Sequence, residues 1–553
     1  MDQDKILEIK NLFIEKKYSA LILLIEEIAK KNDLSAQLFN ILGASKTLKS
    51  NRNKKDMLSA IDCFKKAYLK EKKTNQGLEA LTNFISLSLN IHQYKDSLVY
   101  FEEAYSFFGY NQGLFWAMSR LYKYLNNIDK TIYFLERLIK NNDNRISTWC
   151  SYIYFNSFKK NWSQKDFLKH AKILAQMLPL YPSEKLININ KKKNSKIKLA
   201  FLSGDVKKKH SITYFLKTIL NHVDKEKYEL FFFSNSKINE EDETTKNFKE
   251  LFDVWVNINK LQDIPAINEI RKNKIDIIID IMGITSSSRI SLFKNRLAPT
   301  QISWLGYCNT TGLNEIDYII ADPNLINKEE EDLYSEKVIF LPNIWNCHSG
   351  FNLKRELPQL NIKNHKYITF GSFNNYNKIS DDVMRVWSEI LRKIDKSRLL
   401  LKSSLPYDVK RLKEKFKKNG VIDSVVFYER KENFDDHLNL YKEIDVALDT
   451  FPYNGVTTSF EAIWMSVPVL TLRGFNFTSR CGQSINKNIN MEYLIANDEN
   501  DYVLKAIELS EAPDKLLNMK KKLFEDAPTS PLFNSQKFSI SFFKTLEKIY
   551  YNL

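Results

Sequence analysis

The sequence predicts a multidomain protein in which an all-α helical-repeat arm precedes two consecutive α/β units. Residues 1–187 contain very little glycine or proline, and their apolar residues recur at helical spacing. After residue 196, short apolar runs alternate with helical stretches, a pattern typical of a parallel sheet that helices cover on both faces. Because this alternation occurs twice, we expect two doubly wound domains, over residues 196–360 and 366–553.

A repeated pattern of small and large side chains indicates the architecture of the arm. The order small, large, small occurs three times, at Ala60, Phe64 and Ala67, at Ser97, Phe101 and Ala104, and at Thr131, Leu135 and Leu138. Successive copies are 37 and then 34 residues apart. The pattern resembles tetratricopeptide helical pairs, in which small residues let two helices approach and the large residue packs between them. The match is degenerate, so any helical solenoid stays open as an alternative.

The apolar runs of the α/β units indicate where a ligand is expected. The first unit contains Ile197–Ser203, Tyr228–Ser234 and Ile275–Ile281, and the second contains Tyr367–Phe373, Ser397–Lys402, Ser424–Glu429, Ile444–Thr450 and Val467–Leu472. Ligands of doubly wound sheets bind at the carboxyl ends of the strands. We therefore expect the chemistry in the loops after these runs, in a cleft between the two units.

The composition favours a large cytoplasmic enzyme. The chain has 553 residues, 43% hydrophobic and 13% aromatic, which suits several cores rather than a disordered chain. It shows neither a basic and apolar leader nor a run of about eighteen apolar residues, so we expect neither secretion nor a membrane span. The five cysteines lie far apart without CxxC spacing, which favours a reducing cytoplasm over disulfides or a zinc site.

The chain is basic overall. Its net charge of +16 comes from 83 basic and 67 acidic residues, scattered apart from short clusters such as Lys191–Lys193 and Lys207–Lys209. A solvated surface explains most of this excess, and the functional alternative is attraction for anionic substrates such as nucleotide diphosphates, or for acidic proteins. No basic motif interleaved with aromatic residues is visible, so we do not expect a nucleic-acid partner.

The most informative segment runs from Leu448 to Leu472 and predicts a strand, a loop with Gly455, a helix and a second strand. The helix opens with Thr457 and Thr458, and free backbone N–H groups at a helix start favour a diphosphate. Glu461, one turn further on, could accept both hydroxyls of a ribose. The structural alternative is an ordinary helix cap by one of the threonines, with Glu461 stabilising the helix start. The pattern alone leaves both interpretations open.

This segment is similar to the donor-binding signature of the protein O-GlcNAc transferase family, in which an LDTxPYNGxTTxxEALWMGVPV pattern recurs. Further blocks resemble the same family in the same order: Arg296–Gly312, Ile316–Pro323, Tyr334–Pro342, Phe370–Ile379 and Ser530–Asn534. Together the blocks cover residues 196–553, and the helical repeats before them match the family's arrangement. On this resemblance the chain is identified as a member of the family.

The resemblance implies a GT-B fold and an inverting enzyme that transfers a sugar from a UDP donor to Ser or Thr hydroxyls of a protein. N-acetylglucosamine is the leading candidate for that sugar. It implies no cofactor and no metal, the UDP-sugar being a co-substrate, and an acceptor protein that the helical arm recruits. The only D-x-D spacing, the metal-diphosphate signature of other transferases, is Asp2-Gln3-Asp4 at the start of the chain. Without a metal, cations or N–H donors of the protein must stabilise the departing diphosphate.

Three residues of the second unit receive donor-binding roles from the resemblance. Lys378 matches the family lysine that neutralises the diphosphate, and Asn375 holds a position that contacts phosphate. His437 matches a histidine near the uracil. Without the motif, Lys378 and His437 would be interpreted as a surface lysine and a helix-surface histidine.

The acceptor side of the site is assigned to the first unit. His210 corresponds to the histidine of the family's SxDFxxHxxxYF block, which lies near the reacting hydroxyl, and an imidazole that titrates near neutral pH suits a general base. The loop before His210 is one residue longer than in relatives. Ile284 stands where relatives show histidine, and Val456 replaces a polar residue or glycine, so donor or acceptor preference is open.

Two alternatives remain from the sequence. The first is the family's bacterial branch, which attaches glucose from UDP-glucose to asparagine, because donor specificity depends on pocket shape. The second, of a different class, is an inactive helical-repeat scaffold. Lys378 and the paired threonines argue against the scaffold, whereas Ile284 favours it.

Overall fold

The computed structural model describes residues 3–50, 53–91, 94–182, 195–207, 210–286, 288–361, 367–403, 406–429, 431 and 433–551. These residues form two compact units, Met1–Tyr152 and Ile153–Leu553. Asp2, Lys191–Lys193, Lys208, Lys209 and the domain boundaries expected at residues 187 and 366 lie outside the described residues.

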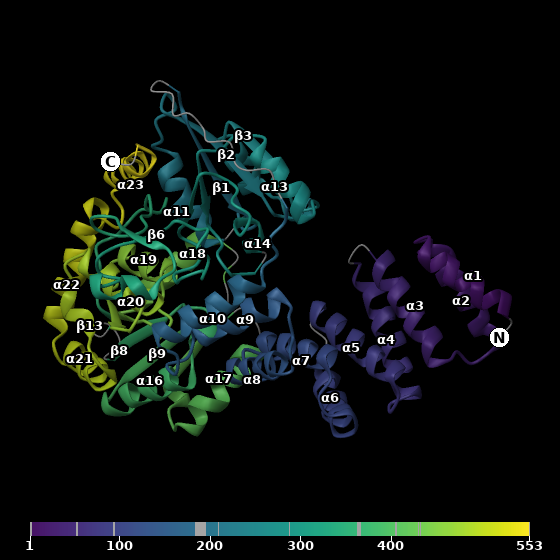
Figure 1. Cartoon of the computed structure of the whole chain (residues 1–553). Coiled ribbons are helices and arrows are strands. Elements are labelled where there is room, and N and C mark those ends of the chain that lie inside the picture. Colours follow the sequence, from purple (N-terminus) through teal and green to yellow (C-terminus); the bar gives the residue numbers. More distant parts are fainter. Residues whose placement is uncertain are drawn as a thin grey trace. The chain divides into compact units, whose positions relative to one another are not determined.

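The first unit is all helical. Its helices are α1 (Gln3–Ile14), α2 (Tyr18–Lys31), α3 (Ala36–Lys49), α4 (Lys54–Lys70), α5 (Asn75–Asn90), α6 (Lys95–Phe108), α7 (Gln112–Tyr124) and α8 (Ile128–Lys140), followed by α9 (Ile146–Asn156), within which the two units divide. Figure 1 shows these helices following one another in antiparallel pairs. Short polar side chains cap most of their starts, and the caps of α3, α4, α5, α7 and α8 are Ser35, Asn53, Thr74, Asn111 and Asn127.

The repeated small, large, small pattern occupies the buried faces of α4, α6 and α8. All nine residues of the three copies are buried. A β-carbon on Gly43 of α3 would lie 2.8 Å from the ring of Phe64 on α4. Gly43, which is not part of the repeated pattern, therefore allows α3 and α4 to approach closely.

The second unit contains two parallel sheets. The first sheet has the order β3-β2-β1-β4-β5-β6-β7, with strands β1 (Ile197–Ser203), β2 (Tyr228–Ser234), β3 (Val254–Asn257), β4 (Ile277–Asp280), β5 (Thr300–Ser303), β6 (Tyr318–Ala321) and β7 (Lys337–Phe340). The second has the order β10-β9-β8-β11-β12-β13, with strands β8 (Ile368–Ser372), β9 (Ser397–Ser403), β10 (Val425–Glu429), β11 (Val446–Leu448), β12 (Val469–Leu472) and β13 (Ile495–Ala496). We name residues 195–361 the first lobe and residues 367–534 the second lobe.

The central strands are buried along their whole length. All four residues of β4 and all five of β8 are buried, which requires cover on both faces of each sheet. Ala200 of β1 is in register with Phe231 of β2 and with Ile278 of β4, so apolar side chains form continuous rows across the sheet. The predicted alternation of helices with buried parallel strands is confirmed.

Helices cover the sheets. Those of the second unit are α10 (Gln164–Met177), α11 (Ser211–Leu220), α12 (Glu243–Lys249), α13 (Asp263–Arg271), α14 (Ile290–Phe293), α16 (Asp381–Lys393), α17 (Pro406–Lys418), α18 (Phe434–Asn439), α19 (Thr457–Trp464), α20 (Phe477–Lys487), α21 (Glu499–Glu511), α22 (Pro513–Asp526) and α23 (Ser535–Tyr551). None of the described helices is long and apolar enough to cross a membrane.

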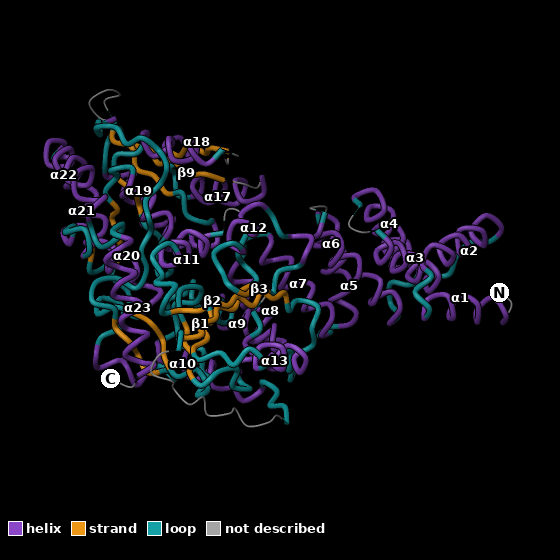
Figure 2. Tube along the Cα trace, turned by 90° about the horizontal axis from the view of Figure 1, so that it is seen from above, coloured by secondary structure: helices purple, strands orange, loops and turns teal. Residues whose placement is uncertain are grey.

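The last helix packs on the first lobe, although it follows the second lobe in sequence. Both views place α23 beside α11 (Figure 1 and Figure 2). The hydroxyl of Tyr228 donates to the carbonyl oxygen of Phe543 at 3.2 Å, and the ring of Trp304 lies 4.6 Å from that of Phe542. The chain therefore passes between the lobes twice.

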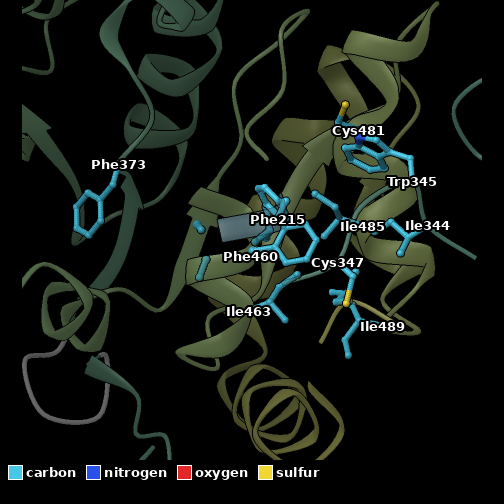
Figure 3. Packing of buried hydrophobic residues seen from close by; sticks show 14 of the residues in the cluster. Phe215, Ile344, Trp345, Cys347, Phe373, Phe460, Ile463, Cys481, Ile485 and Ile489 are labelled. Atoms are coloured by element: carbon cyan, nitrogen blue, oxygen red, sulfur yellow. The ribbon is translucent and has the colours of Figure 1, made fainter. Parts of the chain in front are cut away.

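One apolar core joins the two lobes. Figure 3 shows Phe215 of α11 against Phe460 of α19, with Ile463 below them; the two rings meet edge to face, 5.2 Å apart. Polar contacts add to this core, because Ser484 of α20 donates to the buried carboxylate of Asp322 at 2.7 Å. The lobes are thus held together by packing as well as by the chain.

Candidate functional site

Both sheets have a point at which the strand order reverses, between β1 and β4 in the first and between β8 and β11 in the second. Ligands of doubly wound sheets bind outside the carboxyl ends of the strands at this point. His210 follows β1, and Asn375 and Lys378 follow β8. Gly455, Thr457, Thr458 and Glu461 follow β11, and His437 lies on α18 just before β11. The structure therefore brings seven of the eight predicted residues to one edge of the second sheet and places His210 at the edge of the first.

Lys378 lies at the centre of the second-lobe edge, on a short 3-10 turn (Tyr376–Lys378) that follows β8. Its Nζ donates to the carbonyl oxygen of Asn454 at 2.7 Å and lies 4.6 Å from the centre of the Tyr453 ring. Burial lowers the pKa of Lys378, while the nearby Asp449 carboxylate opposes this shift. The ammonium is thus held over the loop that precedes α19.

The loop after β11 is fixed by a buried carboxylate. Asp449 accepts hydrogen bonds from the backbone N–H of Gly455 at 2.7 Å and from the hydroxyl of Thr471 at 2.8 Å. Burial raises the pKa of Asp449 to about 6. The Asn454 side chain closes the loop, donating to the carbonyl oxygen of Thr450 at 2.9 Å and accepting from the N–H of Gly482 at 3.1 Å. The backbone before α19 is therefore preorganised.

The start of α19 carries no side-chain cap. Val456 occupies the cap position, and neither threonine caps the helix. The hydroxyl of Thr458 instead donates to Oδ1 of Asn374 at 2.9 Å. The helix-cap interpretation of these threonines therefore does not describe this structure, whereas an uncapped start is the arrangement that suits an anion.

Asn374 is a site residue that the sequence reasoning missed, one position before the predicted Asn375. Asn374 is buried and touches Thr458, whereas Asn375 is exposed and its side chain accepts from the N–H of Asn377 at 3.0 Å within the turn. The sequence contained a signal, because Asn374 directly follows the apolar run Tyr367–Phe373 that predicts β8.

Glu461 and His437 form a buried polar cluster beside this helix. Nε2 of His437 lies 3.0 Å from Oε2 of Glu461, and the hydroxyl of Tyr441 donates to the same oxygen at 2.9 Å. The Nζ of Lys402 lies 2.7 Å from Nδ1 of His437. Lys402 and Tyr441 are further residues that sequence reasoning did not select. The two predicted nucleoside-binding residues thus share one cluster one turn beyond the helix start.

His210 lies at the carboxyl-end edge of the first sheet, at the position directly before α11. Its Nε2 lies 3.9 Å from Oδ2 of Asp205, and its Nδ1 is buried without a hydrogen-bond partner among the described residues. Burial lowers the pKa of His210 and raises that of Asp205. At neutral pH the imidazole is therefore neutral and can accept a proton.

The loop after β4 completes the first-lobe edge. Asp280 accepts from the N–H groups of Met282 at 2.9 Å and Gly283 at 3.1 Å, and burial raises its pKa to about 6. Gly283 has a φ of +59°, and a β-carbon there would lie 2.3 Å from Cβ of Tyr307. Ile284 is 2% exposed, so its side chain is part of the core.

The described residues hold no group of three or more His, Cys, Asp and Glu side chains that could bind a metal ion. Lys378, the start of α19 and Thr458 supply cationic and polar donors at the second-lobe edge. These groups suit a diphosphate. The carboxylate of Glu461 is an acceptor that suits hydroxyl groups.

A mutant of the Thermobaculum terrenum O-GlcNAc transferase has a TM-score of 0.81 to this chain at 21% identity, covering 94% of this chain and 98% of the other. This likeness confirms the predicted GT-B fold with a helical region before it.

Curated relatives are similar over the same region. A Solanum lycopersicum protein named "Probable UDP-N-acetylglucosamine--peptide N-acetylglucosaminyltransferase SPINDLY" is 28% identical over 406 residues, which are 71% of this chain and 42% of the relative. An Arabidopsis thaliana protein named "Probable UDP-N-acetylglucosamine--peptide N-acetylglucosaminyltransferase SEC" is 23% identical over 402 residues, 70% of this chain and 40% of the relative. The chain thus spans about two fifths of the length of these relatives.

The family model described as Glycosyl transferase family 41 matches residues 164–367 and 357–542. These ranges contain every candidate site residue and both sheets. The chain therefore belongs to glycosyl transferase family 41.

Proposed function

We propose that this protein transfers N-acetylglucosamine from UDP-N-acetylglucosamine to Ser or Thr hydroxyls of a protein acceptor. The observation that carries this proposal is the position of Lys378, whose Nζ lies over the loop before the uncapped start of α19. Family membership and the names of the similar proteins support the transferred group.

Donor binding follows from the second-lobe edge. Lys378 and the N–H groups that open α19 hold the diphosphate, with the hydroxyls of Thr457 and Thr458 beside them. Glu461 accepts from the ribose hydroxyls, and His437 lies next to the base. As the bond between the sugar and the diphosphate breaks, Lys378 neutralises the charge that develops on the leaving group.

Acceptor activation is assigned to the first-lobe edge. The acceptor oxygen attacks the anomeric carbon from the face opposite UDP and inverts its configuration. His210, neutral at pH 7 because burial lowers its pKa, takes the hydroxyl proton. Asp205, 3.9 Å away, stabilises the imidazolium that forms.

The helical arm completes the proposal. The repeats of the first unit form a stack of helix pairs, and such stacks offer long surfaces for an extended peptide. We assign recruitment of the acceptor polypeptide to this unit and sugar transfer to the second unit. We propose that the reaction takes place in the cytoplasm.

A panel of nucleotide sugars tests the function. The full chain is incubated with UDP-N-acetylglucosamine, UDP-glucose or a GDP-sugar, in excess chelator, with candidate acceptor proteins. We expect nucleotide release and an acceptor mass increase with UDP-N-acetylglucosamine alone, at Ser or Thr. Transfer of glucose to Asn would favour the bacterial asparagine-modifying branch instead. Loss of donor binding in chelator would contradict the metal-free mechanism.

A further inference from the structure

Residues 157–163 connect α9 to α10 and lie outside both sheets. They contact the loop between β11 and α19, residues 449–456, which we name the donor loop. Phe158 is 4% exposed, and its ring stacks on that of Tyr453 with centroids 4.8 Å apart and planes 13° apart. Tyr154, one turn earlier, meets the same ring edge to face at 6.3 Å. One face of Tyr453 is therefore fixed by residues that lie outside both lobes.

Tyr453 also contacts the lysine that the mechanism uses. The ammonium of Lys378 lies 4.6 Å from the centre of the Tyr453 ring, and it donates to the carbonyl oxygen of Asn454, the next residue, at 2.7 Å. A cation over an aromatic face is attracted by the ring quadrupole. The position of the Tyr453 ring thus helps to determine the position of the lysine Nζ.

A second contact of the same connection lies two residues further on. The Nζ of Lys160 lies 4.9 Å from the ring centre of Phe451, in the loop that contains Tyr453. Lys160 is also paired with Glu499 at the start of α21. Two separate contacts therefore hold the donor loop against the α9–α10 connection.

Gln164, the first residue of α10, anchors the connection to both lobes. Its Nε2 donates to Oδ1 of Asn309 in the first lobe at 2.7 Å, and its Oε1 accepts from Nδ2 of Asn476 in the second lobe at 3.2 Å. Gln164 is buried. The support behind Tyr453 is thus fixed at its far end as well.

We propose that Phe158 is a positioning residue for sugar transfer, which acts through the Tyr453 ring to hold Lys378 where the leaving diphosphate develops its charge. The inference rests on the proposed function of Lys378. It gives Phe158, which lies before both lobes, a positioning role in the reaction rather than only a place in a tether for the arm.

Kinetics of the full chain test the proposal. Phe158→Leu keeps apolar volume and removes the flat ring, and we expect kcat to fall by about 10- to 100-fold with KM little changed, because a displaced charge matters most in the transition state. Phe158→Tyr keeps the ring and should restore most of kcat. The matched control is Trp162→Leu, which removes a ring that packs on Phe167 and His170 of α10.

A second readout does not depend on turnover. Acetylation of Lys378 by acetic anhydride, measured by mass spectrometry against exposed Lys410, should be faster in Phe158→Leu and unchanged in Phe158→Tyr and Trp162→Leu. Equal losses of kcat in Phe158→Leu and Trp162→Leu, or unchanged acetylation of Lys378, would overturn the positioning role. If the wild type transferred no sugar while the acetylation pattern held, the proposed function would fail. The contacts from Phe158 through Tyr453 to Lys378 would still stand.

Discussion

The surroundings of Lys378 make its positive charge costly in free energy. Burial lowers its pKa, and its neighbours are an aromatic face, a backbone carbonyl and the Asp449 carboxylate, whose own pKa is raised to about 6. Under the proposed function, an incoming diphosphate would meet a partly desolvated cation, which interacts more strongly than a fully hydrated one.

We expect Lys378→Ala to lower kcat by about 100- to 1,000-fold, because the leaving group then develops its charge without a cation. Thermal unfolding followed by circular dichroism should change little. A nucleotide-release assay measures the loss. Lys410→Ala, which removes an exposed lysine of α17, is the matched control. A rate for Lys378→Ala close to that of the control would remove Lys378 from the mechanism.

The pH dependence of the rate should report His210. Burial lowers its pKa below the ordinary value of about 6.5. The neutral base is therefore present at pH 7 and is lost as the pH falls through the lowered pKa, so the acid limb of kcat/KM should lie below about pH 6.5.

In His210→Ala, we expect a rate lower by about 100- to 10,000-fold and no acid limb from this group. His222→Ala, at an exposed histidine near Ser535, should keep both the rate and the limb. An unchanged limb in His210→Ala would assign it to another group, and Asp205, whose pKa burial raises, would be the first to examine.

At the residue scale, the motif predicted which candidate residues lie together better than it predicted their individual contacts. Lys378, in the turn after β8, lies at the same edge as His437 of α18 and Glu461 of α19. The choice between Asn374 and Asn375 depends on which amide reaches Thr458, and that is decided by the turn after β8, which local sequence does not specify.

At the scale of the elements, α10 belongs with the two lobes, because Gln164 at its start contacts both of them. Gln164 hydrogen-bonds a buried amide in each lobe, so Gln164→Ala removes the acceptor of Nδ2 of Asn476 and one of the two donors to Oδ1 of Asn309. We expect the free energy of unfolding to fall by about 1–3 kcal/mol, the usual cost of unsatisfied buried groups. Urea unfolding measures it, with exposed Gln536→Ala of α23 as the control. Equal stabilities of the two variants would contradict the bridging role.

Long buried strands were predicted more closely than short ones. β1 and β2 have the predicted bounds, Ile197–Ser203 and Tyr228–Ser234. Each is a run of seven mostly apolar residues, which predicts a strand without information from the rest of the sheet. β5 is only the four residues Thr300–Ser303, with polar side chains. Its position between β4 and β6 comes from the sheet rather than from its own pattern, so sequence periodicity could not indicate it.

At the scale of the whole molecule, the compact units suggest where the arm can be removed. The second unit begins at Ile153, whereas the sequence predicts that the arm extends to residue 187. A chain that begins at residue 146 keeps α9, Phe158 and Gln164. We expect it to bind UDP and modify a short peptide, but to lose transfer to an intact acceptor protein, because only the recruiting surface is missing.

A chain that begins at residue 188 lacks α10 as well, and we expect it to aggregate or to turn over slowly. Solubility, UDP calorimetry and transfer to both acceptors compare the two chains. Unchanged transfer to intact protein by the chain that begins at residue 146 would reject recruitment by the arm.

The packing of α23 on the first lobe also has a consequence for the order in which the protein is made. The last strand of the first lobe ends at Phe340, and α23 begins at Ser535, roughly 200 residues later. At about 5–20 residues per second, a ribosome needs roughly 10–40 s to synthesise that stretch. During this interval the apolar surface around Tyr228 and Trp304 faces water or a chaperone. Premature termination shortly before Ser535 should therefore release chains whose second lobe is complete. Their first lobe would still expose this apolar surface and would be prone to aggregation.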